Sequence, residues 1–441
     1  MKTENSSPTI DNTIYESCIN KLLNELNLQD GIALGVLESL CEKGLAERCP
    51  DITPEYKARL AHEMDIINKK GMIWGFLIIW DFIKFARSKN IMISPGCGAL
   101  PGSLVAYSLG ITKVDPIKNK LLFERFLNSE SQSNTYGIRI DVEKGAKAQI
   151  LDYISEKYGS EMPKILEMAD IEINECIDLS IIKETVKIIW QNWCIDIDIS
   201  SIDLNDTEVY DYFSEKARYG VFCFDENYEA MTYAYIFHDV INISDNRKLW
   251  NEYLVPLVYR SNALFKRIEP NSFNEFAAAM SFDRPGTEKC IEKYKINKNN
   301  PDKIVYECPE LESILSETYG CVIYQEQVMK ILQEMAGFSP EQSNKCRRAL
   351  SKRAIGEIKE YRTQFINGNK EESITGCISN GISETIAESV FDRLYLDAPY
   401  CFNKVHAICY SQIVYTMVWL KYYFESEFQE AVDTWRMARK S

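Results

Sequence analysis

The sequence is poor in histidine and has no closely spaced pair of cysteines. Only three histidines occur among 441 residues, and the fourteen cysteines are scattered without a C-x-x-C pair. A zinc site of the usual Cys and His spacing therefore has no candidate ligands, and a disulfide framework is not indicated. We expect the cysteines to be reduced thiols.

An excess of positive charge and a long apolar run are also missing. The formal net charge is −15, which excludes nucleic-acid binding through overall charge, so any such binding must be local. The most apolar stretch, residues 72–80, has about half the length of a membrane span. The N-terminal residues lack the basic-then-apolar pattern of a signal peptide. We expect a cytoplasmic protein without a membrane partner.

What is present is enough apolar sequence for packed cores and a mainly helical periodicity. Hydrophobic residues make up 46% of the chain and aromatic residues 12%, which is ample for two or three domains. Periodicity, with Gly and Pro as boundaries, predicts an alternating strand over 137–143 and a short strand-like start to the segment 175–194. Helices are predicted over 14–47, from 54 to about 70, and over 73–88, 103–109, 144–158, 175–194, 272–280, 309–317, 321–336, 340–368, 383–395 and 405–431.

Two segments stand out from this pattern. The stretch SPGCGALPGSLVAY at 94–107 is rich in Gly and Pro, which predicts a turn that opens a helix. The region 340–365 has a local charge of +4, from seven basic minus three acidic residues. The basic residues are Lys345, Arg347, Arg348, Lys352, Arg353, Lys359 and Arg362, and the acidic ones are Glu341, Glu357 and Glu360.

Six segments, in this order, resemble landmarks of the bacterial replicative DNA polymerases of family C, the DNA polymerase III alpha subunits. They are SPGCGALPGSLVAY at 94–107, LLFERFLN at 121–128, RPG at 284–286, ETYGCVIYQEQVM at 317–329, CRRALSKR at 346–353 and CFNKVHAICY at 401–410.

The resemblance implies an α+β, mostly helical fold with a truncated, polymerase beta-like nucleotidyltransferase palm and a helical fingers domain. It runs from about residue 37 to about 432. We expect an N-terminal helical segment over 1–55, the truncated palm over 56–227, a helical and tyrosine-rich insert over 228–262, and the fingers over 263–441.

The resemblance also implies that the metal site is altered. In the family, two aspartates of a D-x-D-x-D strand and one on a neighbouring strand hold two Mg²⁺ ions. The two strand positions match Gly137 and Arg139, whereas Asp141 and Asp178 match the third strand position and the remote aspartate. A guanidinium about 4 Å from a divalent ion would be repelled by about 8 kcal/mol at an effective dielectric constant of about 20. We therefore expect no bound metal, with Asp141 and Asp178 as insufficient catalytic remnants.

The position of Arg139 has two interpretations. It can replace the cation and pair with Asp141 and Asp178, because residues 139 and 141 share one face of a strand. It can equally form an ordinary ion pair on the strand surface. A shifted trio of Asp141, Glu143 and Asp178 would restore a metal site, but its register is displaced. The imitation motif at 196–198 is expected to be a solvated strand or loop.

Nucleotide or DNA contact is the property that the resemblance leaves in place. In the glycine turn the family's Arg and Ser are replaced by Cys97 and Ala99, while backbone N–H groups at the helix start can still receive an anion. The alternatives are a turn without a ligand and a solvated basic helix face. The candidate contacts are Gly96, Gly98, Gly102, Ser103, Arg125, Arg347, Arg348, Lys352, Arg353, Lys404 and His406.

Together these observations predict a catalytically impaired relative of the alpha subunit that acts by binding a nucleotide, DNA or a replication partner, as a regulator or decoy. One alternative is a slow DNA-directed DNA polymerase that needs Mg²⁺ and uses Asp141, Glu143 and Asp178. Another is a protein-interaction scaffold with no nucleic-acid role, whose partner, another protein chain, binds the insert at 228–262. The first interpretation requires no cofactor.

Overall fold

The computed structural model describes residues 33–127, 137–215, 221, 264–282 and 287–438. The insert expected at 228–262 and the RPG landmark at 284–286 lie outside the described residues, as does most of the helix expected from residue 14. The chain divides into two compact units, Met1–Cys176 and Ile177–Ser441. This boundary falls inside the range 56–227 that the sequence assigned to a palm.

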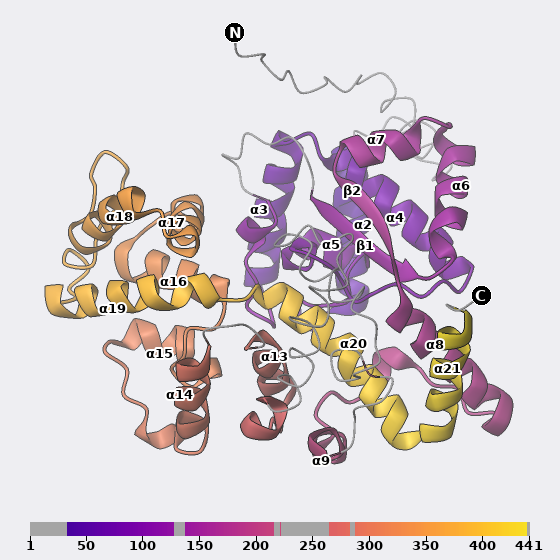
Figure 1. The fold of residues 1–441 in the computed structure, drawn as a ribbon. Coiled ribbons are helices and arrows are strands. Elements are labelled where there is room, and N and C mark those ends of the chain that lie inside the picture. The colour runs from indigo at the N-terminus through magenta and orange to yellow at the C-terminus, as the bar shows by residue number, and fades with distance from the viewer. Residues whose placement is uncertain (1–32, 128–136, 216–220, 222–263, 283–286, 439–441) are drawn as a thin grey trace, which may run out of the picture. The chain divides into compact units, whose positions relative to one another are not determined.

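The first unit packs helices around a two-stranded parallel sheet (Figure 1). Helix α4 is apolar on nearly all sides and its buried residues include Phe76, Ile79 and Phe82, as the apolar run at 72–80 predicted. A helix that is hydrophobic all round must be surrounded by protein. The helices of this unit are α2 (Ala33–Arg48), α3 (Pro54–Lys69), α4 (Ile73–Ser88), α5 (Leu104–Ser108), α6 (Ala146–Tyr158) and α7 (Met162–Met168).

The sheet consists of β1 (Ile138–Glu143) and β2 (Ile171–Cys176), which run parallel with Ile138 opposite Ile171. Parallel strands need a long crossover connection, and α6 and α7 supply it. In β1, Ile138, Ile140 and Val142 are buried while the alternate residues are half-buried. The predicted strand and its alternation are therefore confirmed.

The regular elements of the second unit are helices and 3-10 turns in its described residues, and two isolated β-bridges, Tyr324 with Phe402 and Asn369 with Ile374, join its loops (Figure 1). One apolar cluster gathers side chains of α15 to α19, and α20 packs against α13, α8 and α21. The helices are α8 (Ile177–Trp193), α9 (Thr207–Glu215), α13 (Phe273–Ser281), α14 (Glu288–Lys298), α15 (Pro309–Leu315), α16 (Gln325–Ala336), α17 (Pro340–Lys352), α18 (Ile355–Asn367), α19 (Glu384–Asp397), α20 (Lys404–Tyr423) and α21 (Glu425–Ala438).

Two long helices predicted from the sequence are wrong in extent, because the structure has two shorter helices in place of each. The predicted helix 340–368 breaks at Arg353, which takes a left-handed conformation with φ 53° and ends α17. The predicted helix 405–431 breaks at Phe424, with φ −140° and ψ 56°. Neither break carries Gly or Pro, so the apolar period runs through both.

The imitation motif at 196–198 lies outside the regular elements. The segment 195–198 is an irregular stretch in which Asp196 and Asp198 are exposed, and Asp198 accepts a hydrogen bond from the Ser200 amide. The expectation of a solvated strand or loop is confirmed.

The described cysteines are free thiols. Among the described helices, none is both long and apolar enough to cross a membrane.

Candidate functional site

The glycine turn lies directly against the strand that carries Asp141. The Ser94 amide donates to the Asp141 carbonyl over 2.9 Å, and the Glu143 amide donates to the Met92 carbonyl over 3.0 Å. The Cys97 side chain forms a hydrogen bond with the Asp141 carboxylate. The structure therefore brings together the two segments that the sequence singled out separately.

Two glycines of the turn are required by different constraints. Gly98 has φ 63°, and a Cβ atom there would meet open space, so only its left-handed backbone favours glycine. At Gly102 a Cβ atom would lie 2.8 Å from the Leu122 carbonyl oxygen. Gly102 therefore allows the segment before Arg125 to pack on the turn.

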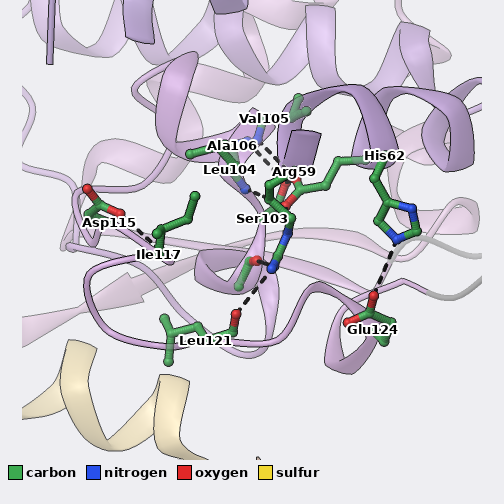
Figure 2. Close-up of polar contacts among 12 residues, drawn as sticks. Arg59, His62, Ser103, Leu104, Val105, Ala106, Asp115, Ile117, Leu121 and Glu124 are labelled. Carbon is green, nitrogen blue, oxygen red and sulfur yellow. Dashed lines mark hydrogen bonds and ion pairs between the residues drawn. The ribbon is translucent and has the colours of Figure 1, made fainter. Parts of the chain in front are cut away.

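Ser103 and the first amides of α5 bind a carboxylate of the same chain. The side chain of Glu63, on α3, is fully buried and accepts hydrogen bonds from Ser103 Oγ over 2.7 Å, from the Leu104 amide over 2.9 Å and from the Val105 amide over 3.1 Å. Figure 2 shows these donors converging at the helix start. The donors that the sequence offered to a phosphate are thus engaged by Glu63.

Arg59 completes this network. Its Nε atom donates to Glu63 over 2.6 Å, and its Nη2 atom donates to the carbonyls of Gly102 over 2.9 Å and Leu121 over 3.3 Å (Figure 2). Burial raises the pKa of Glu63, while Arg59 and the three other donors oppose that shift. One helix therefore fixes both the glycine turn and the segment that leads to Arg125.

Arg125 lies at the end of a 3-10 turn, Phe123–Arg125, and is half-buried. The carboxylate of its neighbour Glu124 lies 3.3 Å from His62 Nε2, on α3 (Figure 2). This second contact with α3 holds the turn from the other side. The backbone around Arg125 is therefore positioned by α3 at two points.

The half-buried face of β1 carries Arg139, Asp141 and Glu143, as predicted. Arg139 Nε lies 3.3 Å from the Glu172 carboxylate, its direct neighbour on β2. Both side chains are more than a third exposed, so this pair contributes little to stability. This contact is an ion pair on the strand surface, which is the second of the two interpretations of Arg139.

Asp141 is placed differently from its neighbour. It faces Asn174 across the strands, and burial raises its pKa, whereas hydrogen bonds from Cys97 and Asn174 and the charge of Arg139 lower it. Its Oδ1 atom is buried and accepts no hydrogen bond from the residues that the structure describes. Asp141 thus remains a partly desolvated carboxylate beside the glycine turn.

Gly137 precedes β1 and has φ 59°. A Cβ atom there would lie 3.6 Å from Asp170 Oδ2, and burial raises the pKa of Asp170 while the Gly137 amide lowers it. An aspartate at this position would be strained and close to a second carboxylate. Glycine at this position therefore fits the left-handed backbone that precedes β1.

The remaining candidate carboxylates are engaged elsewhere. Glu143 Oε2 accepts a hydrogen bond from the Met92 amide over 3.3 Å. Asp178 lies in the first turn of α8 and not on a strand, because β2 ends at Cys176, and its side chain is fully buried. In the described part of the chain, no group of three or more His, Cys, Asp or Glu side chains is arranged to hold a metal ion.

In the second unit, two of the predicted basic contacts are buried. Arg347 is 7% exposed and donates to Asn344 Oδ1 over 2.5 Å. Lys404, also 7% exposed, forms an ion pair with Glu317, with both oxygens within 2.9 Å of Nζ. Arg347 is engaged within α17, and Lys404 joins α20 to the 3-10 turn Ser316–Thr318. Being buried, neither side chain offers an open surface for a phosphate.

The other basic residues are exposed at the end of α17. Arg348 and Lys352 are exposed four residues apart on one helix face, and Arg353 is exposed with its guanidinium 5.6 Å from the Tyr395 ring centroid. His406 is half-buried and stacks on Tyr410, with ring centroids 5.5 Å apart. Arg348, Lys352 and Arg353 therefore form a small solvent-facing basic group, which we call the α17 basic surface.

Sequence reasoning missed the residues that hold the first site together. Arg59 and Glu63 are four residues apart on a helix, which is a readable ion-pair signal. Their real partners lie about forty residues along the chain, and no local pattern indicates them. Glu172 was missed because the sequence placed a short strand-like start at about residue 175, whereas β2 already begins at Ile171.

Comparison with known proteins identifies relatives over most of the chain. The family described as "Bacterial DNA polymerase III alpha NTPase domain" matches residues 35–182, and the "Bacterial DNA polymerase III alpha subunit finger domain" matches 178–234 and 260–373. The chain is 28% identical to the DNA polymerase III subunit alpha of Staphylococcus aureus (strain MRSA252), over 85% of this chain and 42% of that protein. It is 27% identical to the DNA polymerase III subunit alpha of Ureaplasma parvum serovar 3, over 93% of this chain and 52% of that protein.

The chain thus spans about half the length of the curated relatives it matches. The two family matches contain five of the six landmarks in the order read from the sequence, while the landmark at 401–410 lies beyond them. The matches meet near the boundary between the two units. The chain is therefore a relative of the bacterial DNA polymerase III alpha subunit, a family C DNA polymerase.

Proposed function

We propose that this protein is a catalytically impaired family C polymerase relative that acts by binding DNA or a nucleotide. In this proposal the first unit corresponds to a palm and the second to a fingers domain. The impairment rests on one observation above all: Arg139, at a position where the family has a metal-binding aspartate, is ion-paired with Glu172 on the neighbouring strand.

Charge supports the impairment. A cation attached to the strand that should hold Mg²⁺ repels the ion. Of the two carboxylates on that strand, Asp141 accepts hydrogen bonds from Cys97 and Asn174, and Glu143 accepts one from the Met92 amide. Restoring the site would need a new aspartate at Gly137, where φ is 59°. Both changes oppose the two-metal chemistry of nucleotidyl transfer.

Binding is supported by the α17 basic surface. Arg348, Lys352 and Arg353 are exposed in a protein of net charge −15, and a phosphate backbone is attracted to such local groups. Arg347 and Lys404, although basic, have internal partners. We therefore assign the DNA contact to the three exposed residues and not to the whole predicted set.

The test is a titration of labelled primer-template DNA across a salt series. The triple variant Arg348→Ala/Lys352→Ala/Arg353→Ala is compared with Lys289→Ala/Lys303→Ala/Lys370→Ala, which removes the same charge from exposed lysines elsewhere in the second unit. The first variant should bind more weakly, and its slope of log affinity against log salt should fall by about 2 to 3. The control should keep most of the wild-type slope.

Two results would contradict this assignment. Equal losses in both variants would mean that only net charge matters. Absence of any binding of DNA or deoxynucleotide by the wild type at low salt would favour the scaffold alternative instead. A protein partner that binds an isolated peptide of residues 228–262 would support that alternative directly.

A further inference from the structure

Two thiols of the second unit, Cys290 and Cys321, are in contact although 31 residues separate them in the chain. Cys290 is on α14 and is partly exposed, whereas Cys321 follows the turn before α16 and is 2% exposed. The Cys321 sulfur lies 3.8 Å from the Cys290 carbonyl oxygen, and the two side chains are hydrogen-bonded to each other.

The surroundings make the two sulfur atoms unequal. The hydrogen bond from Cys290 lowers the pKa of Cys321 and burial raises it. The charge of Lys293 lowers this pKa, that of Asp397 raises it and that of Arg393 lowers it. The same hydrogen bond, together with burial, raises the pKa of Cys290. A thiolate is the nucleophilic form of cysteine, so this hydrogen bond favours Cys321 over Cys290 as the attacking sulfur.

The backbone that carries the two residues is already held together. Asn297, on α14, donates from Nδ2 to the Tyr319 carbonyl over 2.7 Å, and Thr318 Oγ1 donates to the Cys321 carbonyl over 2.6 Å. The first bond joins the helix to the turn, and the second fixes the turn itself. A covalent bond between the sulfurs would join two segments that are already in contact.

We propose that Cys290 and Cys321 are a reversible oxidation site, which hydrogen peroxide converts to an intramolecular disulfide. The Cys321 thiolate attacks one peroxide oxygen, the O–O bond breaks, and hydroxide leaves and takes up a proton to form water. The Cys290 sulfur then attacks the sulfenic acid on Cys321, the S–O bond breaks, and the Cys290 proton leaves with the hydroxide as water. Two thiols are oxidised and one peroxide is reduced to two waters.

A third thiol defines the competing product. Cys401 is buried near the pair, with its sulfur 3.7 Å from the Val322 carbonyl and 3.4 Å from the Asp397 carbonyl. Its contacts are to backbone oxygens, and it raises the pKa of Cys290 through charge. The proposal requires that oxidation selects Cys290 and Cys321 and leaves Cys401 as a thiol.

The experiment treats the full chain with hydrogen peroxide, blocks the remaining thiols under denaturing conditions and maps non-reduced peptides by mass spectrometry. A peptide pair that joins Cys290 to Cys321, has lost two hydrogen atoms and is separated by dithiothreitol is the expected result. Alkylation of Cys401 should be unchanged. A bond between Cys401 and either residue, or full alkylation of both thiols after treatment, would overturn the proposal.

A single variant tests the order of the two steps. In Cys290→Ser, which changes a partly exposed residue, Cys321 should stop at the sulfenic acid and react with dimedone, while circular dichroism shows an unchanged fold. In the wild type, dimedone labelling of Cys321 should be several-fold lower because the disulfide forms. Equal labelling in both proteins would contradict the role of Cys290 as the resolving thiol.

Discussion

Replacing Glu63 with glutamine tests the network that holds the glycine turn. The carboxylate receives four donors, from Arg59, Ser103, Leu104 and Val105, all within 3.1 Å. A glutamine of nearly the same volume offers one acceptor oxygen, so about two donors lose their partner. Each buried donor without a partner costs about 1 to 3 kcal/mol, which gives roughly 3 kcal/mol for the site.

Hydrogen exchange of the Leu104 and Val105 amides measures this loss of stability at the site itself. A local measurement is needed because a chain of two units has no single free energy of unfolding. A loss of about 3 kcal/mol corresponds to exchange about 100-fold faster in Glu63→Gln. The matched control is Asp65→Asn on the same helix, which removes an exposed ion pair with Lys69 and should change exchange by less than about fivefold. Equal exchange in Glu63→Gln and the wild type would refute the reasoning.

Two further predictions concern stability in each unit. Gly102→Ala should lower the melting temperature of the first unit, because the added Cβ atom would lie 2.8 Å from the Leu122 carbonyl oxygen. The control is Gly35→Ala, at a helical position with open space, which should not lower the melting temperature. A drop of the same size in both variants would contradict the prediction. In the second unit, burial opposes the ionisation of Glu427, but hydrogen bonds from the Trp193 indole over 2.7 Å and from Asn192 outweigh it and lower the pKa of Glu427. A pKa that is lowered in the folded state contributes stability at neutral pH, and this stability is lost as the pH falls through that pKa. Trp193→Phe removes the indole donor, so it should be less stable than the wild type by about 1 kcal/mol at pH 7. This difference should shrink below about pH 4. A difference in melting temperature that does not depend on pH would argue against Glu427 as the acceptor.

Much of the fold could be predicted from the sequence because local signals were strong. The apolar run within α4 and the alternation of β1 each specify their element without help from distant residues. The helix breaks at Arg353 and Phe424 could not be predicted, because both residues are compatible with a helix and tertiary packing decides their conformation. The two-stranded sheet needed a partner strand whose register only the folded chain reveals.

The candidate site divides in the same way. The resemblance indicated the altered positions Gly137 and Arg139, and the structure adds the contact of Cys97 with Asp141 that joins the turn to the strand. Charge alone gave no means to separate the buried Arg347 from the exposed Arg348 one residue later. Helical phase separates them, since a shift of one residue rotates a side chain by about 100°.

The central claim, that the chain binds without transferring nucleotides, is tested most directly by primer extension with the purified full chain, deoxynucleotides and Mg²⁺. We predict no extension above that of the Asp178→Ala variant, in conditions where the wild type binds the same primer-template. Extension by the wild type that depends on Mg²⁺ and disappears in Asp178→Ala would contradict the account and establish an active polymerase.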